Sequence, residues 1–249
     1  MLLYAQAAEG YRAGGFNTSG QGGQAFNAPD AGPQPYRRFQ GDELVSFEAG
    51  ARLSLLDGAL KMRLAAFRAE WSQIQTDRLL ADGLPFTANV GDGHNTGLEV
   101  EAAWLRGGLT LEGDLLINDP ELSDPDPGFP IPADRHLPGI ADILANASAR
   151  YEWTSERGRQ AWVGMDVGYV GQSSLTFDAA LAPEMGGYVT SRAQAGLSGR
   201  AWRASVYVDN LFGQDGDTFA YGNPFRLRYR DAQTPQRPTT VGVVLTQQF

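Results

Sequence analysis

Hydrophobic and polar residues alternate along several stretches of this chain, and residues 201–209 show the pattern most clearly. One face of this stretch would carry Trp202, Ala204, Val206 and Val208. The opposite face would carry Arg203, Ser205, Tyr207 and Asp209. A period of two over this length predicts a β-strand with one apolar and one polar face.

The same alternation recurs along the whole sequence and predicts about ten strands. Besides 201–209, the expected strands are 2–12, 45–55, 60–71, 97–104, 109–115, 141–153, 160–171, 188–198 and 238–249. Strands and turns throughout agree with the 31 glycines of the 249 residues. The pattern therefore predicts an all-β fold.

Residues 60–71 could instead form an amphipathic helix, because they contain good helix formers. Leu60, Met62 and Leu64 alternate, but the pattern slips at Ala65-Ala66. A β-bulge would produce such a slip. The preceding Asp57-Gly58 is a hairpin signal, so we predict a strand with a bulge.

The connections between the expected strands alternate strictly between short and long. The long ones are 13–42, 73–95, 118–140, 172–187 and 213–237, and the short ones are 57–58, 106–108, 154–159 and 199–200. In an up-and-down antiparallel sheet, alternate connections lie at opposite ends. Short turns at one end and long loops at the other are typical of transmembrane β-barrels.

The two faces of the expected sheet differ in a way that suits a membrane barrel. The polar faces carry Glu99, Glu101, Glu112, Asp114, Asn146, Arg150, Asp166, Arg192, Gln194 and Arg203, and the chain has one lysine, Lys61. This mixture indicates a hydrated lumen with charge pairing. Aromatic residues near strand ends suggest interfacial girdles, namely Trp104, Tyr151, Trp153, Tyr169 and Trp202. The alternative is that aromatics are simply good strand formers in a soluble β-domain.

Charge and cysteine content narrow the function classes. A net charge of −9 argues against nucleic-acid binding. The absence of cysteine excludes disulfides, thiolate zinc sites, iron–sulfur clusters and cysteine nucleophiles. No apolar run approaches the roughly 18 residues of a transmembrane helix, and Glu9 interrupts the only signal-peptide-like start.

Residues capable of catalysis or metal binding are few, and we expect neither an enzyme nor a cofactor. His94 and His136 fall in expected long loops without metal-ligand spacing. Glu99 and Glu101 could mimic a glycosidase pair, but neighbours on one strand face are better explained as a lumenal ladder. The remaining candidates are Asp124-Pro-Asp-Pro-Gly128 and Asp215-Gly-Asp217 for calcium, and Arg226, Arg228 and Arg230 for an anionic ligand or lipopolysaccharide phosphate. Turn formation and an exposed basic extension are the simpler explanations of these last two groups.

Short motifs along nearly the whole chain resemble the C-terminal half of a TonB-dependent outer-membrane receptor. Asn89-Val-Gly91 with Gly97-Leu-Glu-Val-Glu101, for example, is similar to the "N-x-G … G-x-E-x-E" step of that family. The other similar segments are 9–17, 47–58, 65–67, 73–75, 137–151, 210–212 and 237–249. Their order and spacing make the set specific.

The C-terminus resembles the barrel-assembly signal of that family. Phe249 is the terminal aromatic residue, and Val241, Val243 and Leu245 occupy alternate positions before it. Gln247 departs from the usual apolar residue. The resemblance implies that the barrel-assembly machinery reads this segment.

The resemblance implies a location in the Gram-negative outer membrane and a role in uptake of a ligand such as a siderophore. Residues 1–249 would be the C-terminal part of the barrel, without the plug domain, the TonB box and the N-terminal strands, as a truncation or excised fragment. Contact with the TonB system would then run only through the missing plug. Lipid and lipopolysaccharide would contact the outside, and ligand contacts would come from the long loops.

Because ten strands are fewer than the 22 of such transporters, we expect a curved sheet that does not close fully. Two other functions remain open at this stage. One is a porin-like passive barrel, and the other is a soluble β-sandwich that binds a ligand or hydrolyses a glycoside.

Overall fold

The computed structural model describes residues 1–17, 37–79, 85–127, 135–175, 177, 184–220 and 233–247. Ten antiparallel strands form one sheet in these residues, in the order β1-β4-β5-β8-β9-β10-β11-β14-β15-β18. Their bounds are β1 Leu2–Arg12, β4 Asp42–Leu55, β5 Leu60–Ser72, β8 Gly91–Arg106, β9 Leu109–Pro125, β10 Ile143–Thr154, β11 Gln160–Val170, β14 Tyr188–Ser198, β15 Trp202–Asp209 and β18 Thr240–Gln247. Each strand pairs with its neighbour in the chain, so the predicted up-and-down topology is confirmed.

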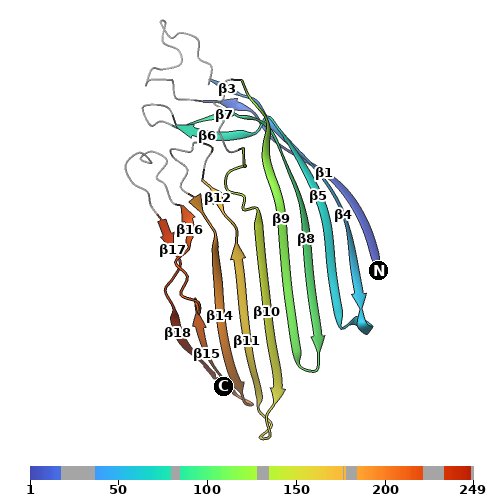
Figure 1. Cartoon of the computed structure of the whole chain (residues 1–249), viewed down its shortest axis with the longest axis vertical. Helices are drawn as coiled ribbons and strands as arrows, with labels where there is room; N and C mark the ends of the chain where they lie inside the picture. Colours follow the sequence, from blue (N-terminus) through green and yellow to red (C-terminus); the bar gives the residue numbers. More distant parts are fainter. Residues whose placement is uncertain are drawn as a thin grey trace.

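Small two-stranded ribbons lie in the long connections, at one end of the sheet, whereas tight turns join the strands at the other end (Figure 1). The ribbons pair β2 Gly15–Phe16 with β3 Arg38–Phe39, β6 Gln75–Leu79 with β7 Pro85–Asn89, β12 Ser173–Ser174 with β13 Glu184–Met185, and β16 Asp217–Ala220 with β17 Gln233–Pro235. We call these two ends the loop end and the turn end. The predicted segregation of long and short connections is confirmed.

The expected Asp57-Gly58 hairpin is one of the tight turns. It is the short 3-10 turn η2, Leu56–Gly58, in which Gly58 has φ +87° and Asp57 has φ 54°. Positive φ is the conformation that glycine and, more rarely, aspartate tolerate, which explains the choice of these residues.

The strand register sorts side chains onto an apolar face and a polar face. The apolar face includes the cross-strand rows Leu64–Val100–Leu115 and Ala195–Val206–Val243. Large side chains on it are exposed within the chain, with 56% for Leu98 and 65% for Val243. No second layer of described residues covers this face, so a β-sandwich is excluded as the fold of the described residues.

Strand β5 corrects one expectation from the sequence. Its register with both β4 and β8 runs without a shift past Ala65 and Ala66, so the predicted bulge is wrong. The pattern slips because Phe67 lies on the polar face, where its ring occupies the space beside Gly97. The Phe67 ring fits on the polar face because Gly97 has no Cβ in the space that the ring occupies.

Strands β8 and β9 are longer than predicted. Strand β8 begins at Gly91 and β9 ends at Pro125, so residues 91–95 and 118–125, which were expected in loops, belong to strands. Asn118 explains how polar residues are accommodated in this extension. Its side chain is buried, accepts a hydrogen bond from Asn95 Nδ2 at 2.9 Å and donates one to the Ala141 carbonyl at 2.7 Å. Side-chain hydrogen bonds replace apolar packing there.

A small hydrophobic core lies at the loop end rather than between layers. It consists of Ile74, Val90, Leu122 and Leu137, with Trp71, Ile140 and Phe177 packed against it. These residues come from three connections and the adjoining strands, and they join the loop bases into one unit. The described part of the chain contains no helix that could span a membrane.

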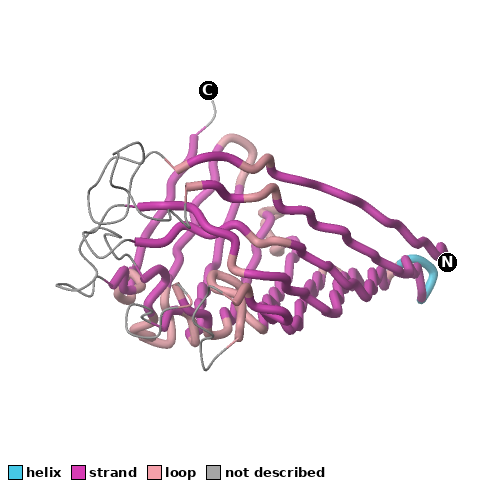
Figure 2. The backbone as a smooth tube through the Cα atoms, turned by 90° about the horizontal axis from the view of Figure 1, so that it is seen from above, coloured by secondary structure: helices cyan, strands magenta, loops and turns pink. Residues whose placement is uncertain are grey.

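The sheet is open. Among the described residues, β1 pairs only with β4, and β18 pairs only with β15. The N-terminal strand β1 and the last described strand β18 lie at opposite edges of the sheet (Figure 1 and Figure 2). The expectation of incomplete closure is confirmed, and each outer strand keeps a row of backbone N–H and C=O groups free for a further strand.

Candidate functional site

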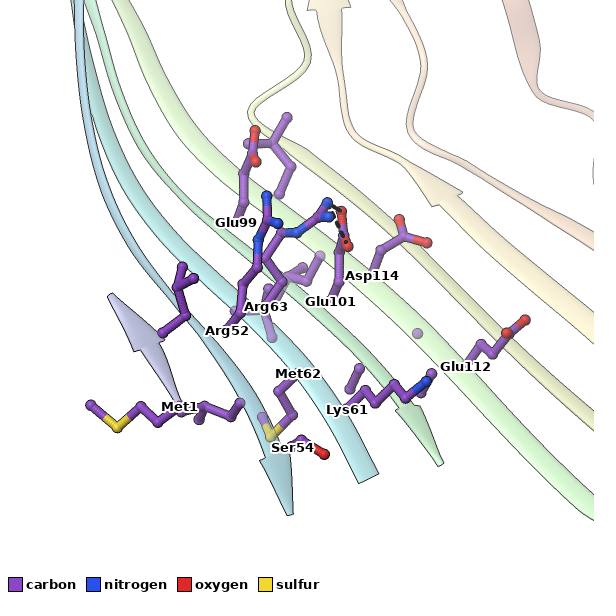
Figure 3. Close-up of a pocket in the computed structure, with 18 residues that line it drawn as sticks. Met1, Arg52, Ser54, Lys61, Met62, Arg63, Glu99, Glu101, Glu112 and Asp114 are labelled. Carbon is purple, nitrogen blue, oxygen red and sulfur yellow. Dashed lines mark hydrogen bonds and ion pairs between the residues drawn. The ribbon is translucent and has the colours of Figure 1, made fainter. Parts of the chain in front are cut away.

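The polar face contains a hollow of about 890 Å³ between β4, β5, β8 and β9 (Figure 3). Its charged lining residues are Arg52, Lys61, Arg63, Glu99, Glu101, Glu112 and Asp114. Arg63 Nη1 lies 3.0 Å from a carboxylate oxygen of Glu101, and both side chains are about half exposed. An exposed pair of this kind stabilises the fold by less than about 1 kcal/mol. It orders the wall while leaving it hydrated.

A second hollow of about 720 Å³ follows the polar face toward the loop end, between β9 and β15. Three contacts order its wall. Asn146 Nδ2 donates to Asp114 at 2.8 Å, Gln194 Nε2 donates to Asp166 at 3.2 Å, and Arg192 Nε lies 3.4 Å from Asp209. Four carboxylates, two arginines and several amides line this hollow, so it has an excess of negative charge and can bind polar molecules or polar protein surfaces.

The predicted lumenal ladder is present. The register places every polar-face residue expected from the sequence on one side of the sheet. Glu99 lies opposite Ala65, and Glu101 lies opposite Arg63. The two glutamates therefore belong to neighbouring cross-strand rows, and the ion pair of Glu101 with Arg63 supports charge pairing along the ladder.

A buried carboxylate organises the base of the first two loops. The side chain of Asp42 is 2% exposed. Its oxygens accept hydrogen bonds from Arg12 Nε at 2.9 Å, from Trp71 Nε1 at 3.0 Å and from the Gln75 N–H at 3.3 Å. We call Arg12, Asp42, Trp71 and Gln75 the Asp42 cluster. It joins the ends of β1, β4 and β5 to the start of β6.

Two opposing effects set the ionisation of Asp42. Burial alone would raise the pKa of this carboxyl group, but the hydrogen bonds from Arg12, Gln75 and Trp71 together hold its pKa below the ordinary value. Asp42 is therefore charged at neutral pH. Asp42 is the first residue of β4, at the loop end and beyond the apolar part of the strand.

Side-chain amides extend this cluster into the loops. Gln75 Nε2 donates to the carbonyls of Ala13 at 3.1 Å and Gln40 at 2.9 Å. Asn89 Nδ2 donates to the Gln73 carbonyl at 2.6 Å, and Asn17 Nδ2 donates to the Thr87 carbonyl at 2.7 Å. The connections 13–41 and 73–90 are thereby fixed to each other at their bases.

One of the two histidines does not lie where the sequence placed it, whereas His136 lies in the long connection that was expected. His94 belongs to β8 rather than a loop, and it pairs with Glu121, which also bridges to His136. Strand register thus brings two histidines to either side of one glutamate, which no sequence spacing indicated. His136 Nε2 lies 2.7 Å from the Ile140 carbonyl. Within the described ranges, no group of three His, Asp or Glu side chains is arranged to hold a metal ion.

The other sequence candidates are only partly described. Asp124 lies in β9, and Asp217 begins β16, so neither falls in the open loop that was expected. Gly128 and the three arginines Arg226, Arg228 and Arg230 lie outside the described residues.

Three of the four assembly-signal residues and the five aromatics expected in girdles lie on the apolar face. Val241, Val243 and Leu245 pair with Val208, Val206 and Ala204, whereas Phe249 lies outside the described residues. Four of the five expected girdle aromatics lie near the turn end, namely Trp104, Tyr151, Trp153 and Trp202. Tyr169 lies near the loop end of β11. The group at the turn end matches an interfacial aromatic girdle, and Tyr169 is the one residue of the expected set near the opposite end.

Comparisons with known proteins identify the fold. Residues 1–211 match the family described as TonB dependent receptor-like, beta-barrel. Among solved structures, the ferric yersiniabactin uptake receptor FyuA of Yersinia pestis superposes with a TM-score of 0.74 at 23% identity, over 99% of this chain and 35% of that one.

Two further structures give the same answer. The ferric-catecholate import receptor Fiu of E. coli K12 has a TM-score of 0.69 at 19% identity, over 99% of this chain and 33% of its own. The outer-membrane ferripyoverdine receptor of Pseudomonas aeruginosa has a TM-score of 0.67 at 15% identity, over 98% and 30%. The chain thus spans about a third of the length of these receptors.

Proposed function

The chain belongs to the TonB-dependent receptor-like β-barrel family, and from this premise we propose that it forms the C-terminal wall of a receptor that takes up a ferric siderophore. Proteins of this family are receptors of the Gram-negative outer membrane, and this chain is placed in the same membrane. The observation that carries the proposal is the position of the two polar hollows. They lie on the polar face of a sheet whose other face is apolar, beneath a loop end stiffened by the Asp42 cluster.

The open edges support the proposal that further strands complete the barrel. Unpaired N–H and C=O groups in hydrocarbon cost several kcal/mol each. Both β1 and β18 contain such groups along their free edges. We propose that strands beyond residues 1–249 pair with both edges, and that a plug domain fills the enclosed lumen and provides the contact with TonB. Lipopolysaccharide would contact the loop end of the apolar face.

Deletion of codons 1–249 in the bacterium that makes the chain tests this function. We expect the deletion to lower accumulation of ⁵⁵Fe from a panel of ferric siderophores, and restoration of the segment to recover it. Recovery should fail in a strain that lacks TonB, since energy coupling is required. Uptake that is restored equally without TonB would favour the passive, porin-like function, and unchanged uptake after deletion would contradict any role in siderophore import.

We also propose that Phe249, with Val241, Val243 and Leu245, is read by the barrel-assembly machinery. The last three residues form an apolar row on β18, which supports this reading. Removal of Phe249 should lower the amount of chain recovered in the outer-membrane fraction. Gln247→Leu restores the apolar alternation and should not lower it. Equal recovery with and without Phe249 would contradict the proposal.

A further inference from the structure

An apolar groove of about 370 Å³ lies on the apolar face close to the turn end, across β10, β11, β14, β15 and β18. Its walls include Trp153, Val206 and Val243, and its floor includes Ala161 and Ala195. In the register, Ala161 lies between Trp153 and Leu197, and Ala195 lies between Val163 and Val206. Alanines between larger side chains thus leave a depression on the face that meets lipid.

A cation lies at the end of this groove that is nearer the turns. The guanidinium of Arg159 lies over the ring of Trp202, 5.6 Å from its centroid. Trp202 in turn lies against Gly199, where an added Cβ would come within 2.4 Å of the indole nitrogen. Arg159 directly precedes β11, and Trp202 is the first residue of β15. Because β14 lies between these two strands, the arginine side chain reaches across the end of β14.

The surrounding turns add positive charge. Arg157 lies in the same turn as Arg159, and Arg200 lies in the next turn of the C-terminal half, while Glu156 is the only carboxylate in these two turns. Among the described residues, none of these arginines forms an ion pair with a carboxylate. The apolar groove therefore ends near the Arg159 guanidinium, with two further arginines in the adjoining turns.

We propose that this groove is a specific binding site for an anionic phospholipid. One acyl chain lies in the groove along Ala161 and Ala195, and the phosphate is held by the guanidinium of Arg159. Guanidinium groups bind phosphate oxygens through paired, charge-assisted hydrogen bonds. The tryptophan beneath Arg159 marks the level at which headgroups lie.

The side of the membrane follows from the topology. Short turns of outer-membrane barrels lie on the periplasmic side, so the bound lipid belongs to the periplasmic leaflet. The excess of arginine over glutamate in the two turns favours a headgroup with net negative charge over a zwitterionic one. Phosphatidylglycerol should therefore bind more strongly than phosphatidylethanolamine.

Native mass spectrometry of the full chain in detergent, with equal amounts of these two phospholipids, tests the headgroup site. We expect a retained phosphatidylglycerol adduct whose occupancy falls about fivefold in Arg159→Gln, the effect of one arginine near an anionic headgroup. Arg106→Gln is the matched control, because Arg106 also lies at a tight turn on the apolar face, opposite Leu109, away from the groove. Equal occupancy in these two variants would overturn the proposal.

A second pair of variants tests the acyl-chain slot. Ala195→Phe fills the floor of the groove and should lower the occupancy of both phospholipids. Ala49→Phe makes the same change at an exposed position on the apolar face of β4 and should leave both unchanged. If the Ala195→Phe variant retains as much phospholipid as the Ala49→Phe variant, the adducts are bulk lipid only and the proposal is overturned. If Ala195→Phe fails to assemble, the Arg159 comparison decides alone, since Arg159 lies in a turn.

Discussion

Val100→Arg should lower the free energy of unfolding of the chain in a lipid bilayer by about 2–4 kcal/mol, the cost of arginine at the lipid-facing midplane of a barrel. Val100 lies on the apolar face between Leu64 and Leu115. Along β8 it is halfway between Trp104, at the aromatic level, and Thr96, the first polar residue on that face. A guanidinium there cannot reach either interface without distorting the strand.

Ala103→Arg is the control for this prediction. Ala103 lies three residues away in the same strand but on the polar face, directly opposite Lys61 and Glu112. A new arginine there meets water and one charge of each sign, so its effect should stay below about 1 kcal/mol. Urea titration of both variants in phospholipid bilayers makes the measurement. A similar loss in both would mean that the apolar face is not the lipid-facing one.

Asp42→Ala should loosen the base of the first two loops by about 2 kcal/mol, because it removes hydrogen bonds made to a buried charged group. Trp71 Nε1 and the N–H of Gln75 both lose their acceptor. The expected readout is roughly thirtyfold faster hydrogen exchange of the Gln75 amide, the equivalent of that free energy. Glu43→Ala changes the exposed neighbouring carboxylate and should leave this exchange unchanged.

Acid should reproduce the effect of Asp42→Ala. The pKa of Asp42 is lowered in the folded chain, so its contribution to stability is fully present above the unfolded value of about 3.9. That contribution is lost as pH falls through the lower, folded pKa. The protection factor of the Gln75 amide should therefore decrease with acidification below about pH 4 in the parent chain and stay flat in Asp42→Ala. Equal pH profiles would contradict a role for this carboxylate.

The ten-stranded sheet could be predicted from the sequence because its information is local. In β15, apolar and polar residues alternate at successive positions, and this alternation identifies both faces without any knowledge of the neighbouring strands. The predicted bulge and strand bounds were wrong where a residue that breaks the alternation is accommodated by a residue on a neighbouring strand. Phe67 is tolerated on the polar face because Gly97 lies opposite, and Asn118 is tolerated in β9 because Asn95 and a backbone carbonyl satisfy its amide.

The candidate site was less predictable because its contacts join distant segments. Asp42 is an unremarkable loop residue in the sequence, and its role depends on Arg12, Trp71 and Gln75, which three other segments bring to it. The alignment of His94, Glu121 and His136 depends on the register of β8 with β9 and on one isolated bridge from Glu121. Register follows from the whole sheet, so no spacing along the chain could indicate these groupings.

Lipid should cover the apolar face of the sheet, and water should reach the polar face. The chain contains no cysteine, so single cysteines introduced in turn over residues 98–103 can each hold a nitroxide label after assembly into bilayers. Accessibility to oxygen should be high at 98, 100 and 102, and accessibility to a water-soluble nickel complex should be high at 99, 101 and 103. The opposite phase, or equal accessibility of all six positions to the nickel complex, would contradict this account.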